Sequence, residues 1–301
     1  MSIALQSLQI DKLSFTFDIP LAQRDAFARE VNARGTRIDT RSRYASGYRS
    51  AVTLPRSDGR SALAFIACDP WRRYTRFVRV ECNPDKNPLA LGLLHALLTP
   101  FLPPAGWIAV RLSRVDLAVD YPIALQEFVA FARNQKARIF TGPSGIESAY
   151  LGAVRAARQI VIYDKAAELR HRAQRAPEHP LTRIEARLKP AGMSILDLPD
   201  LGNPFETLVI AQPVPTDWPY RFGLYLKEAS AVGVNGVCRR LKRHERTRFR
   251  QMLAAAPVPF THPATIFARE FVQAARLVVG HLTGRISSRR RRTPPTTGGR
   301  P

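Results

Sequence analysis

A tyrosine stands beside an aspartate and a lysine near the end of one predicted strand. The segment RQIVIYDK, Arg158–Lys165, alternates so that Tyr163 and Lys165 share one face, with Ile160 and Ile162 on the other. A tyrosine oxygen can attack phosphorus and form a covalent intermediate. Lys165 could neutralise the phosphate or lower the phenol pKa, which is normally about 10. We predict Tyr163 as a nucleophile and Lys165 as its partner, against the alternative of an ordinary structural tyrosine.

A second segment, RVDLAVDY (Arg114–Tyr121), places Asp116 and Asp120 on one strand face. Carboxylates are ligands for hard divalent ions such as Mg²⁺ and Mn²⁺. Four strand residues span roughly 13 Å, but a ligand oxygen lies about 2.1 Å from Mg²⁺. We therefore predict Asp116 as the metal ligand, while Asp120 acts on metal-bound water or caps a turn. The alternative is that both pair with nearby arginines such as Arg111 or Arg114.

A third segment, TRIEARLK (Thr182–Lys189), places Glu185 between Arg183 and Arg187 on one strand face. A glutamate flanked in this way is usually a paired surface charge. It becomes a second metal ligand if this strand lies beside the strand of Asp116. Arg183 could then hold phosphate oxygens bidentately.

The charge of the chain indicates a polyanionic partner. There are 46 Lys and Arg residues against 24 Asp and Glu residues, a net charge of +22, and such an excess favours phosphate backbones through counterion release. We predict nucleic acid as the partner; a ribosomal or merely basic protein is the alternative. A predicted basic helix, 234–256, supplies the candidate DNA-binding residues Arg239, Arg240, Lys242, Arg243, Arg246 and Arg250.

Other site types lack their motifs. Cys68, Cys82 and Cys238 form no CxxC pair, the histidines form no HxH pair, and there is no GxxxxGK[ST] or Gly-x-Ser-x-Gly element. The N-terminal residues lack the pattern of a signal peptide. The most apolar stretch, 88–110, is interrupted by prolines, so no membrane span is predicted. We expect a cytoplasmic protein.

The order of predicted elements indicates an α+β fold with a mainly antiparallel central sheet covered by helices. Asp58-Gly59 signals a hairpin turn. The strands are expected at 8–17, 49–54, 62–67, 75–81, 107–120, 150–151, 159–163 and 181–188. The helices are expected at 21–32, 89–101, 125–134, 164–174, 234–256 and 264–282. Three regions follow: a catalytic domain at 1–220, a basic helical region at 221–284 and a disordered Arg-rich tail at 285–301.

The three segments RVDLAVDY, RQIVIYDKAAE and RIEARLK, in this order, resemble the replication initiation factor family of filamentous phages and rolling-circle plasmids. IDKLSFTF and VECNPDKNPLALG are also similar to that family, and the resemblance runs from about Ile10 to Leu253. It implies a DNA nicking and closing enzyme with Tyr163 as nucleophile and Asp116 and Glu185 as ligands of Mg²⁺ or Mn²⁺. Members of this group generally lack the paired-histidine motif of other rolling-circle initiators.

The resemblance also implies a mechanism and partners. Tyr163 would form a 5′-phosphotyrosine and release a 3′-hydroxyl that a host polymerase extends, with a host helicase as a further partner in a bacterial cytoplasm. Lys165 and Arg183 would stabilise charge on the phosphate oxygens. Two alternatives remain open: a metal nuclease in which water attacks and Tyr163 stacks on a base, and a non-enzymatic origin or operator binder.

Overall fold

The computed structural model describes residues 6–38, 47–55, 62–127, 129–132, 135–142, 145–172, 177–211, 219–256, 258 and 260–285. A ten-stranded sheet is its central element, with the order β2-β3-β4-β5-β1-β6-β11-β10-β9-β8. The bounds of these strands are β1 Leu8–Phe17, β2 Thr36–Arg37, β3 Tyr48–Pro55, β4 Ala62–Pro70, β5 Val78–Cys82, β6 Arg111–Tyr121, β8 Ala137–Gly142, β9 Gly145–Leu151, β10 Arg158–Asp164 and β11 Thr182–Leu188.

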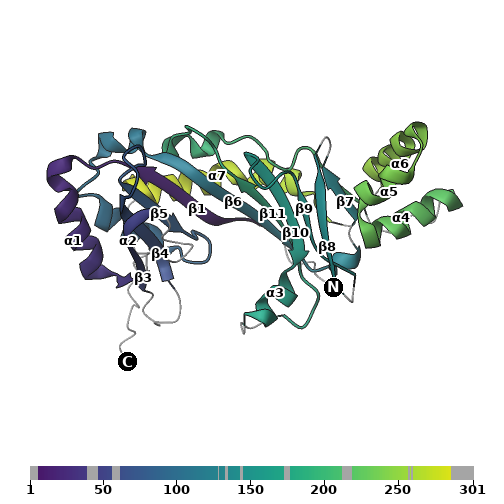
Figure 1. The fold of residues 1–301 in the computed structure, drawn as a ribbon, viewed down its shortest axis with the longest axis horizontal. Helices are drawn as coiled ribbons and strands as arrows, with labels where there is room; N and C mark the ends of the chain where they lie inside the picture. Colours follow the sequence, from purple (N-terminus) through teal and green to yellow (C-terminus); the bar gives the residue numbers. More distant parts are fainter. Residues whose placement is uncertain are drawn as a thin grey trace, which may run out of the picture.

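Helices surround this sheet (Figure 1). They are α1 Arg24–Arg34, α2 Leu89–Leu98, α3 Lys165–His171, α4 Tyr220–Val232, α5 Val234–Arg240, α6 Arg243–Ala255 and α7 Pro263–Thr283. Short 3-10 helices cover Leu21–Gln23, Pro104–Ala109, Leu125–Glu127 and Ile195–Asp200. Every strand pairing among the described residues is antiparallel. The predicted α+β class is confirmed.

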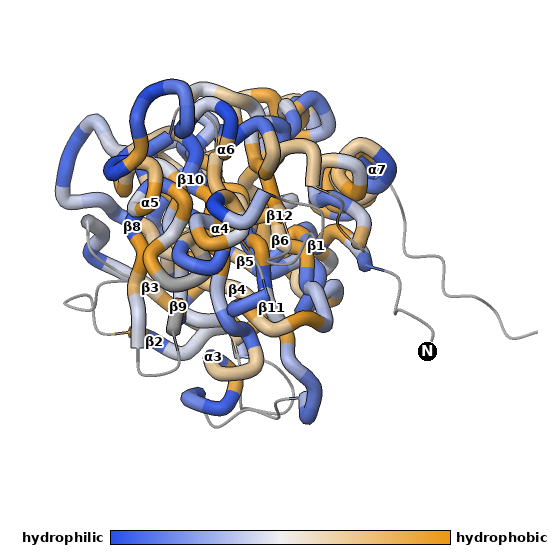
Figure 2. Tube along the Cα trace, turned by 90° about the vertical axis from the view of Figure 1, so that its right-hand side faces the viewer, coloured by the Kyte–Doolittle hydropathy of each residue, from blue (hydrophilic) through white to orange (hydrophobic). Residues whose placement is uncertain are grey.

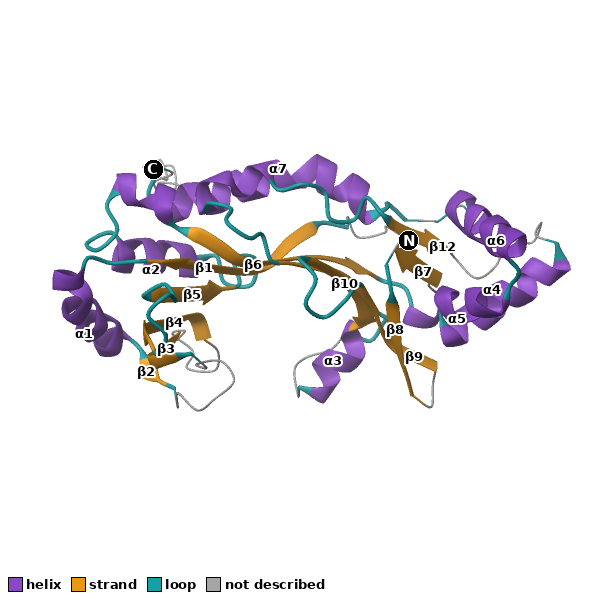
Figure 3. Cartoon of the chain, turned by 45° about the horizontal axis from the view of Figure 1, so that its top comes forward, coloured by secondary structure: helices purple, strands orange, loops and turns teal. Residues whose placement is uncertain are grey.

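The two faces of the sheet differ in polarity because the strand side chains alternate. On β6 and β11, Val115, Leu117, Ile184 and Leu188 point into the main hydrophobic core. Figure 3 shows α7 lying over this apolar face and α3 on the other side of the sheet. Figure 2 shows hydrophobic stretches inside the molecule and hydrophilic ones on outer loops. The opposite face is therefore the one that can carry polar side chains.

Helix α7 packs against the apolar face of the sheet. Its buried side chains, among them Ile266, Phe271 and Val278, recur every three or four residues and so lie on one side of the helix. Its C-terminus ends at Gly284, which has a φ of 71°. A Cβ at this position would lie 2.5 Å from the His95 ring. Glycine is thus required both by the left-handed backbone and by the close approach of α2.

A second, smaller core lies beyond one end of the sheet. A two-stranded sheet, β7 Val129–Ala132 with β12 Leu208–Ala211, packs against α4, α5 and α6. Helix α7, in contrast, belongs to the main core. The helices after residue 219 therefore contribute to both cores.

The predicted helix at 125–134 is wrong. Among the described residues of this range, Leu125–Glu127 forms a 3-10 turn, and Val129–Ala132 is a strand that pairs with β12. Val129 and Phe131 are residue types that favour strands. Their partner strand lies far along the chain, so local spacing could not reveal the pairing.

The single basic helix predicted at 234–256 is also wrong. It is broken into α5 and α6 at Leu241, whose backbone is extended with ψ of 144°. The Glu245 carboxylate accepts a hydrogen bond from the Lys242 backbone N–H at 3.1 Å, which satisfies a free donor at the start of α6. Leu241 is itself buried in the second core. Basic side chains on either side of the break, Arg239 of α5 and Arg243, Arg246 and Arg250 of α6, line one pocket.

The strand predicted from residue 107 begins at Arg111 instead, because Pro104–Ala109 forms a 3-10 helix with Trp107 buried. The predicted Asp58-Gly59 turn and the basic tail from residue 286 onward lie outside the described residues. All three cysteines are free and buried. Among the described helices, none combines the length and the apolar character that a membrane span requires.

Candidate active site

The three segments singled out in the sequence are neighbouring strands, in the order β6-β11-β10. Arg183 of β11 lies opposite Tyr163 on one side and Asp120 on the other, and Arg187 lies opposite Asp116. Directly paired residues of antiparallel strands project to the same face. Tyr163, Glu185 and Asp116 therefore lie on one polar face; the Tyr163 strand pairs with the Glu185 strand, and the Asp116 strand lies on the far side of the Glu185 strand.

The hydroxyl of Tyr163 donates a hydrogen bond to Oε2 of Glu185 at 3.2 Å. The other oxygen of Glu185, Oε1, accepts one from Nε of Arg187 at 2.7 Å. Burial raises the pKa of the Tyr163 phenol, and the Glu185 charge raises it further, while Arg183 opposes them. The phenol is therefore protonated at neutral pH, and it contacts a carboxylate that can accept its proton.

Asp116 is 2% exposed and accepts two hydrogen bonds from Nε of Arg114 and one from Nη2. This is the arginine pairing that the sequence left open as the alternative to a metal site. Burial raises the pKa of Asp116; Arg114 acts in the opposite direction, and the nearby Glu185 charge adds to the rise. Asp116 and Glu185 are thus close enough to interact electrostatically.

Asp116 and Glu185 are two carboxylates on one sheet face, and each is paired with an arginine. No group of three or more His, Cys, Asp or Glu side chains that could hold an ion exists among the described residues. Mg²⁺, however, commonly binds one or two carboxylates and completes its shell with water and phosphate oxygens. Asp116 and Glu185 offer such a pair of hard oxygen donors. An ion there would compete with Arg114 and Arg187 for them.

Arg183 is 3% exposed, and each of its donor nitrogens is engaged. It donates to both carboxylate oxygens of Asp120 at 2.6 Å, and to Asp11 and Gln9 of β1 at 3.0 Å. Burial alone would lower the pKa of Arg183, but the hydrogen bonds and charge of Asp120, with Asp11, raise it. In this structure Arg183 ties β11 to β6 and β1 rather than facing a ligand.

Lys165 is the first residue of α3 and is 7% exposed. Its ammonium pairs with Glu168 and lies 5.8 Å from the centroid of the Tyr163 ring. Asp164 caps the helix by accepting a hydrogen bond from the Ala167 backbone N–H at 2.8 Å. Lys165 is thus near the predicted nucleophile, with a carboxylate partner of its own.

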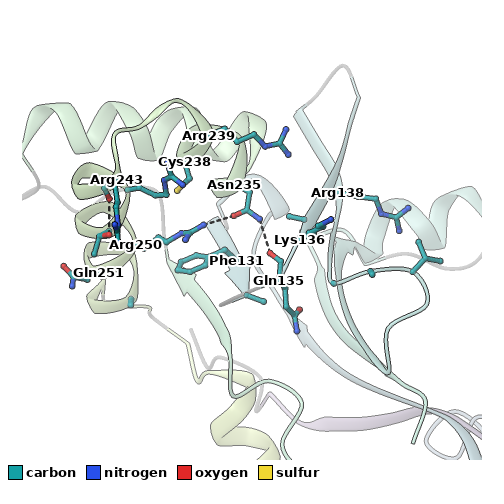
Figure 4. A pocket seen from close by; sticks show the side chains of 18 residues that line it. Phe131, Gln135, Lys136, Arg138, Asn235, Cys238, Arg239, Arg243, Arg250 and Gln251 are labelled. Atoms are coloured by element: carbon teal, nitrogen blue, oxygen red, sulfur yellow. Dashed lines mark hydrogen bonds between the residues drawn. The ribbon is translucent and has the colours of Figure 1, made fainter. Parts of the chain in front are cut away.

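The predicted DNA-binding residues divide into two groups. Arg240 forms an ion pair with Glu228 of α4, and Lys242 lies exposed in the link between α5 and α6. The others line a pocket beside β8, as Figure 4 shows for those it labels; they are Arg239, Arg243, Arg246 and Arg250. The side chains of Tyr163, Asp116 and Glu185 do not line this pocket.

Sequence reasoning missed an aromatic group on the face of Tyr163. Phe140 of β8 and Tyr150 of β9 lie with ring centroids 5.4 Å apart, and Arg138 lies over the Tyr150 ring at 5.4 Å. Phe140 pairs with Ser148, which pairs with Tyr163 in the next strand. The alternation of residues 137–142 was the available signal, because it sets Arg138 and Phe140 on one strand face.

No protein family model matches the chain, and no curated protein matches it either. Among solved structures, the chain is similar to the rolling circle replication initiator protein from Geobacillus stearothermophilus. The two share 13% sequence identity over 77% of this chain and 95% of that chain, with a TM-score of 0.42. A likeness at this level assigns no function to the chain.

Proposed function

We propose that this protein initiates rolling-circle DNA replication by nicking one strand at an origin and staying attached through Tyr163. One observation carries the proposal: the Tyr163 hydroxyl contacts the Glu185 carboxylate at 3.2 Å, on a sheet face that also holds Asp116 and arginines. The net charge of +22 and the sequence resemblance support DNA as the substrate.

The proposed step transfers a phosphoryl group to tyrosine. Oη of Tyr163 forms a bond to phosphorus, and the bond from phosphorus to the 3′ oxygen breaks. The phenol proton passes to Glu185, and the departing 3′ oxygen takes a proton from water. The products are a 5′-phosphotyrosine and a free 3′-hydroxyl, which a host polymerase extends behind a host helicase. Attack by a later 3′-hydroxyl reverses the step and closes the strand.

The neighbouring side chains have separate proposed parts. Asp116 and Glu185 would hold Mg²⁺ or Mn²⁺, which supplies Lewis-acid polarisation of the scissile phosphate when bound. Arg187, with a side chain 33% exposed, fits phosphate contact better than Arg183 does. Arg183 would instead act as a positioning residue, because its hydrogen bonds to Asp120 hold β11 against β6. Lys165 stays a proposed source of positive charge beside the Tyr163 ring.

The test is a nicking assay that also detects covalent attachment. The substrate is a supercoiled plasmid carrying the DNA that surrounds the chain's own coding sequence, with Mg²⁺ or Mn²⁺ added. We expect relaxed plasmid and a protein–DNA adduct that survives denaturant. Nicking without an adduct would support attack by water. Binding without nicking would support a DNA-binding regulator.

Glu185→Gln keeps the size of the side chain but removes its charge. We expect the rate of adduct formation to fall by about 10²- to 10⁴-fold, the usual range for a lost proton acceptor. The measurement is a single-turnover time course on denaturing gels. Glu81→Gln, on β5 of the same sheet, is the matched control and should keep the parent rate. A Glu185→Gln protein as fast as the parent would remove Glu185 from the mechanism.

The second candidate function is a binder that does no chemistry. The specific observation in its favour is that each carboxylate of the site already has an arginine partner, namely Arg114 for Asp116 and Arg187 for Glu185. In addition, the raised pKa of the Tyr163 phenol disfavours spontaneous ionisation. The adduct assay separates this function from the proposed one.

A further inference from the structure

A basic pocket lies beyond the active-site face, between the β8 edge of the sheet and helices α5 and α6 (Figure 4). Its volume is about 1180 Å³, larger than the usual 300–1,000 Å³ of a small-molecule site. Among the described residues, no Asp or Glu lines it. Its basic side chains are Lys136, Arg138, Arg239, Arg243, Arg246 and Arg250, and its apolar ones include Phe131, Ala132, Cys238 and Ala254.

The pocket contains polar atoms that lack partners. Oε1 of Gln135 and Nε of Arg246 are buried, and neither has a hydrogen-bond partner among the described residues. Unsatisfied buried groups of this kind are uncommon in folded proteins. The first is an acceptor and the second a charged donor. Both atoms belong to residues that line the pocket and lie beneath its accessible surface.

A hydrogen-bonded chain holds the pocket wall in place. Arg250 donates to Oδ1 of Asn235 at 3.3 Å, and Nδ2 of Asn235 donates to the carbonyl of Gln135 at 3.4 Å (Figure 4). Arg250 also lies 5.9 Å from the centroid of the Phe131 ring. Gly152, with φ of 105°, lets the chain after β9 pass close to Gln135. The wall joins elements about a hundred residues apart.

We propose that this pocket binds unpaired nucleotides of the DNA strand that Tyr163 cuts. An apolar floor with polar atoms suits a base, and the arginines around it suit phosphates. A base can enter such a pocket only when it is unstacked, so a duplex would have to open first. This inference rests on the proposed nicking function and adds the single-stranded part of its substrate.

Arg138 connects the pocket with the active-site face. It lines the pocket and lies over Tyr150, which shares the polar face with Tyr163. Phe140, 51% exposed, continues this surface toward Ser148 and Tyr163. Exposed aromatic rings beside arginines stack with bases irrespective of sequence. A single strand crossing β8 and β9 would thus reach both sites.

Two tryptophan substitutions on α6 test the pocket without changing its charge. Ala254 lines the pocket, whereas the adjacent exposed Ala255 does not. Both are made in a Tyr163→Phe background, where the proposed nucleophile is absent, so the measurement reports binding alone. The probe is a fluorescein-labelled oligothymidine of about 12 nucleotides, within the site sizes of single-strand binders. Its affinity is measured by fluorescence anisotropy.

We expect Ala254→Trp to weaken single-strand binding about tenfold, the loss of roughly one bound base, and Ala255→Trp to change it less than about twofold. Arg243→Gln should lower the salt slope by about 0.7, and Arg29→Gln on distant α1 should not. Parent affinity in Ala254→Trp would overturn the pocket assignment and leave the nicking proposal standing. The same conclusion would follow if polyglutamate displaced the labelled oligothymidine as well as unlabelled oligothymidine does, because this would indicate an acidic protein partner. If Ala254→Trp loses binding but the parent protein forms no adduct, the pocket assignment stands and Tyr163 is rejected as the nucleophile.

Discussion

Tyr163→Phe is expected to abolish the covalent protein–DNA adduct and to slow nicking by at least about 10³-fold, because a lost nucleophile is not replaced by its neighbours. The change removes one oxygen and keeps the ring. It also removes the hydrogen bond to Glu185, whose other oxygen still pairs with Arg187. The fold and the DNA affinity should therefore persist. The measurement is the yield of denaturant-resistant adduct over time.

Tyr150→Phe is the matched control for this variant. Tyr150 lies on the same sheet face one strand away, opposite Val161, and loses the same atom. Because Tyr150→Phe keeps the ring that would stack on a base, it should form adduct at a rate within about threefold of the parent. An adduct that persists in Tyr163→Phe and disappears in Tyr150→Phe would move the nucleophile to β9. Nicking that persists in both would favour water as the attacking group.

Arg183→Met is expected to lower the free energy of unfolding by about 2–3 kcal/mol, because it leaves Asp120 and Asp11 without their shared cation. This is below the usual cost for a fully buried pair, since the side chains of Asp120 and Asp11 are 21% and 14% exposed. The measurement is urea denaturation followed by circular dichroism.

Two further variants show whether the effect comes from the buried pair. Arg34→Met breaks an exposed ion pair with Glu30 on α1 and should cost under about 1 kcal/mol. Arg183→Met combined with Asp120→Asn should recover part of the lost stability, because the second change removes the Asp120 charge that Arg183→Met leaves unpaired. If Arg183→Met instead unfolds like the parent but nicks far more slowly, Arg183 contacts phosphate as the sequence predicted.

Local sequence pattern was sufficient for the strands that carry the site. Strict alternation in 114–121, 158–164 and 182–188 indicated which side chains share a face, because the period of a strand is fixed by its backbone. The same pattern identified Tyr163, Asp116 and Glu185 as neighbours if their strands pair. Composition indicated a polyanionic partner, since charge adds up irrespective of the fold.

Pairing partners required the tertiary structure. The sequence assigned Arg183 to phosphate, whereas in the fold β1 brings Asp11 and Gln9 to it. The register between distant strands determines such contacts, and no local period encodes it. The same reason explains Val129–Ala132, where a distant strand replaced a predicted helix.

The sequence by itself determined the antiparallel α+β class, the three strands with their polar faces, and the basic character of the chain. Only the tertiary structure decided that Tyr163 contacts Glu185, that Arg183 is buried, and that the break at Leu241 turns α6 toward β8 to form a pocket. Alternation is a property of neighbouring residues, and net charge is a sum over all residues, so both can be read from the sequence. Contacts depend on which distant segments bury their apolar sides together.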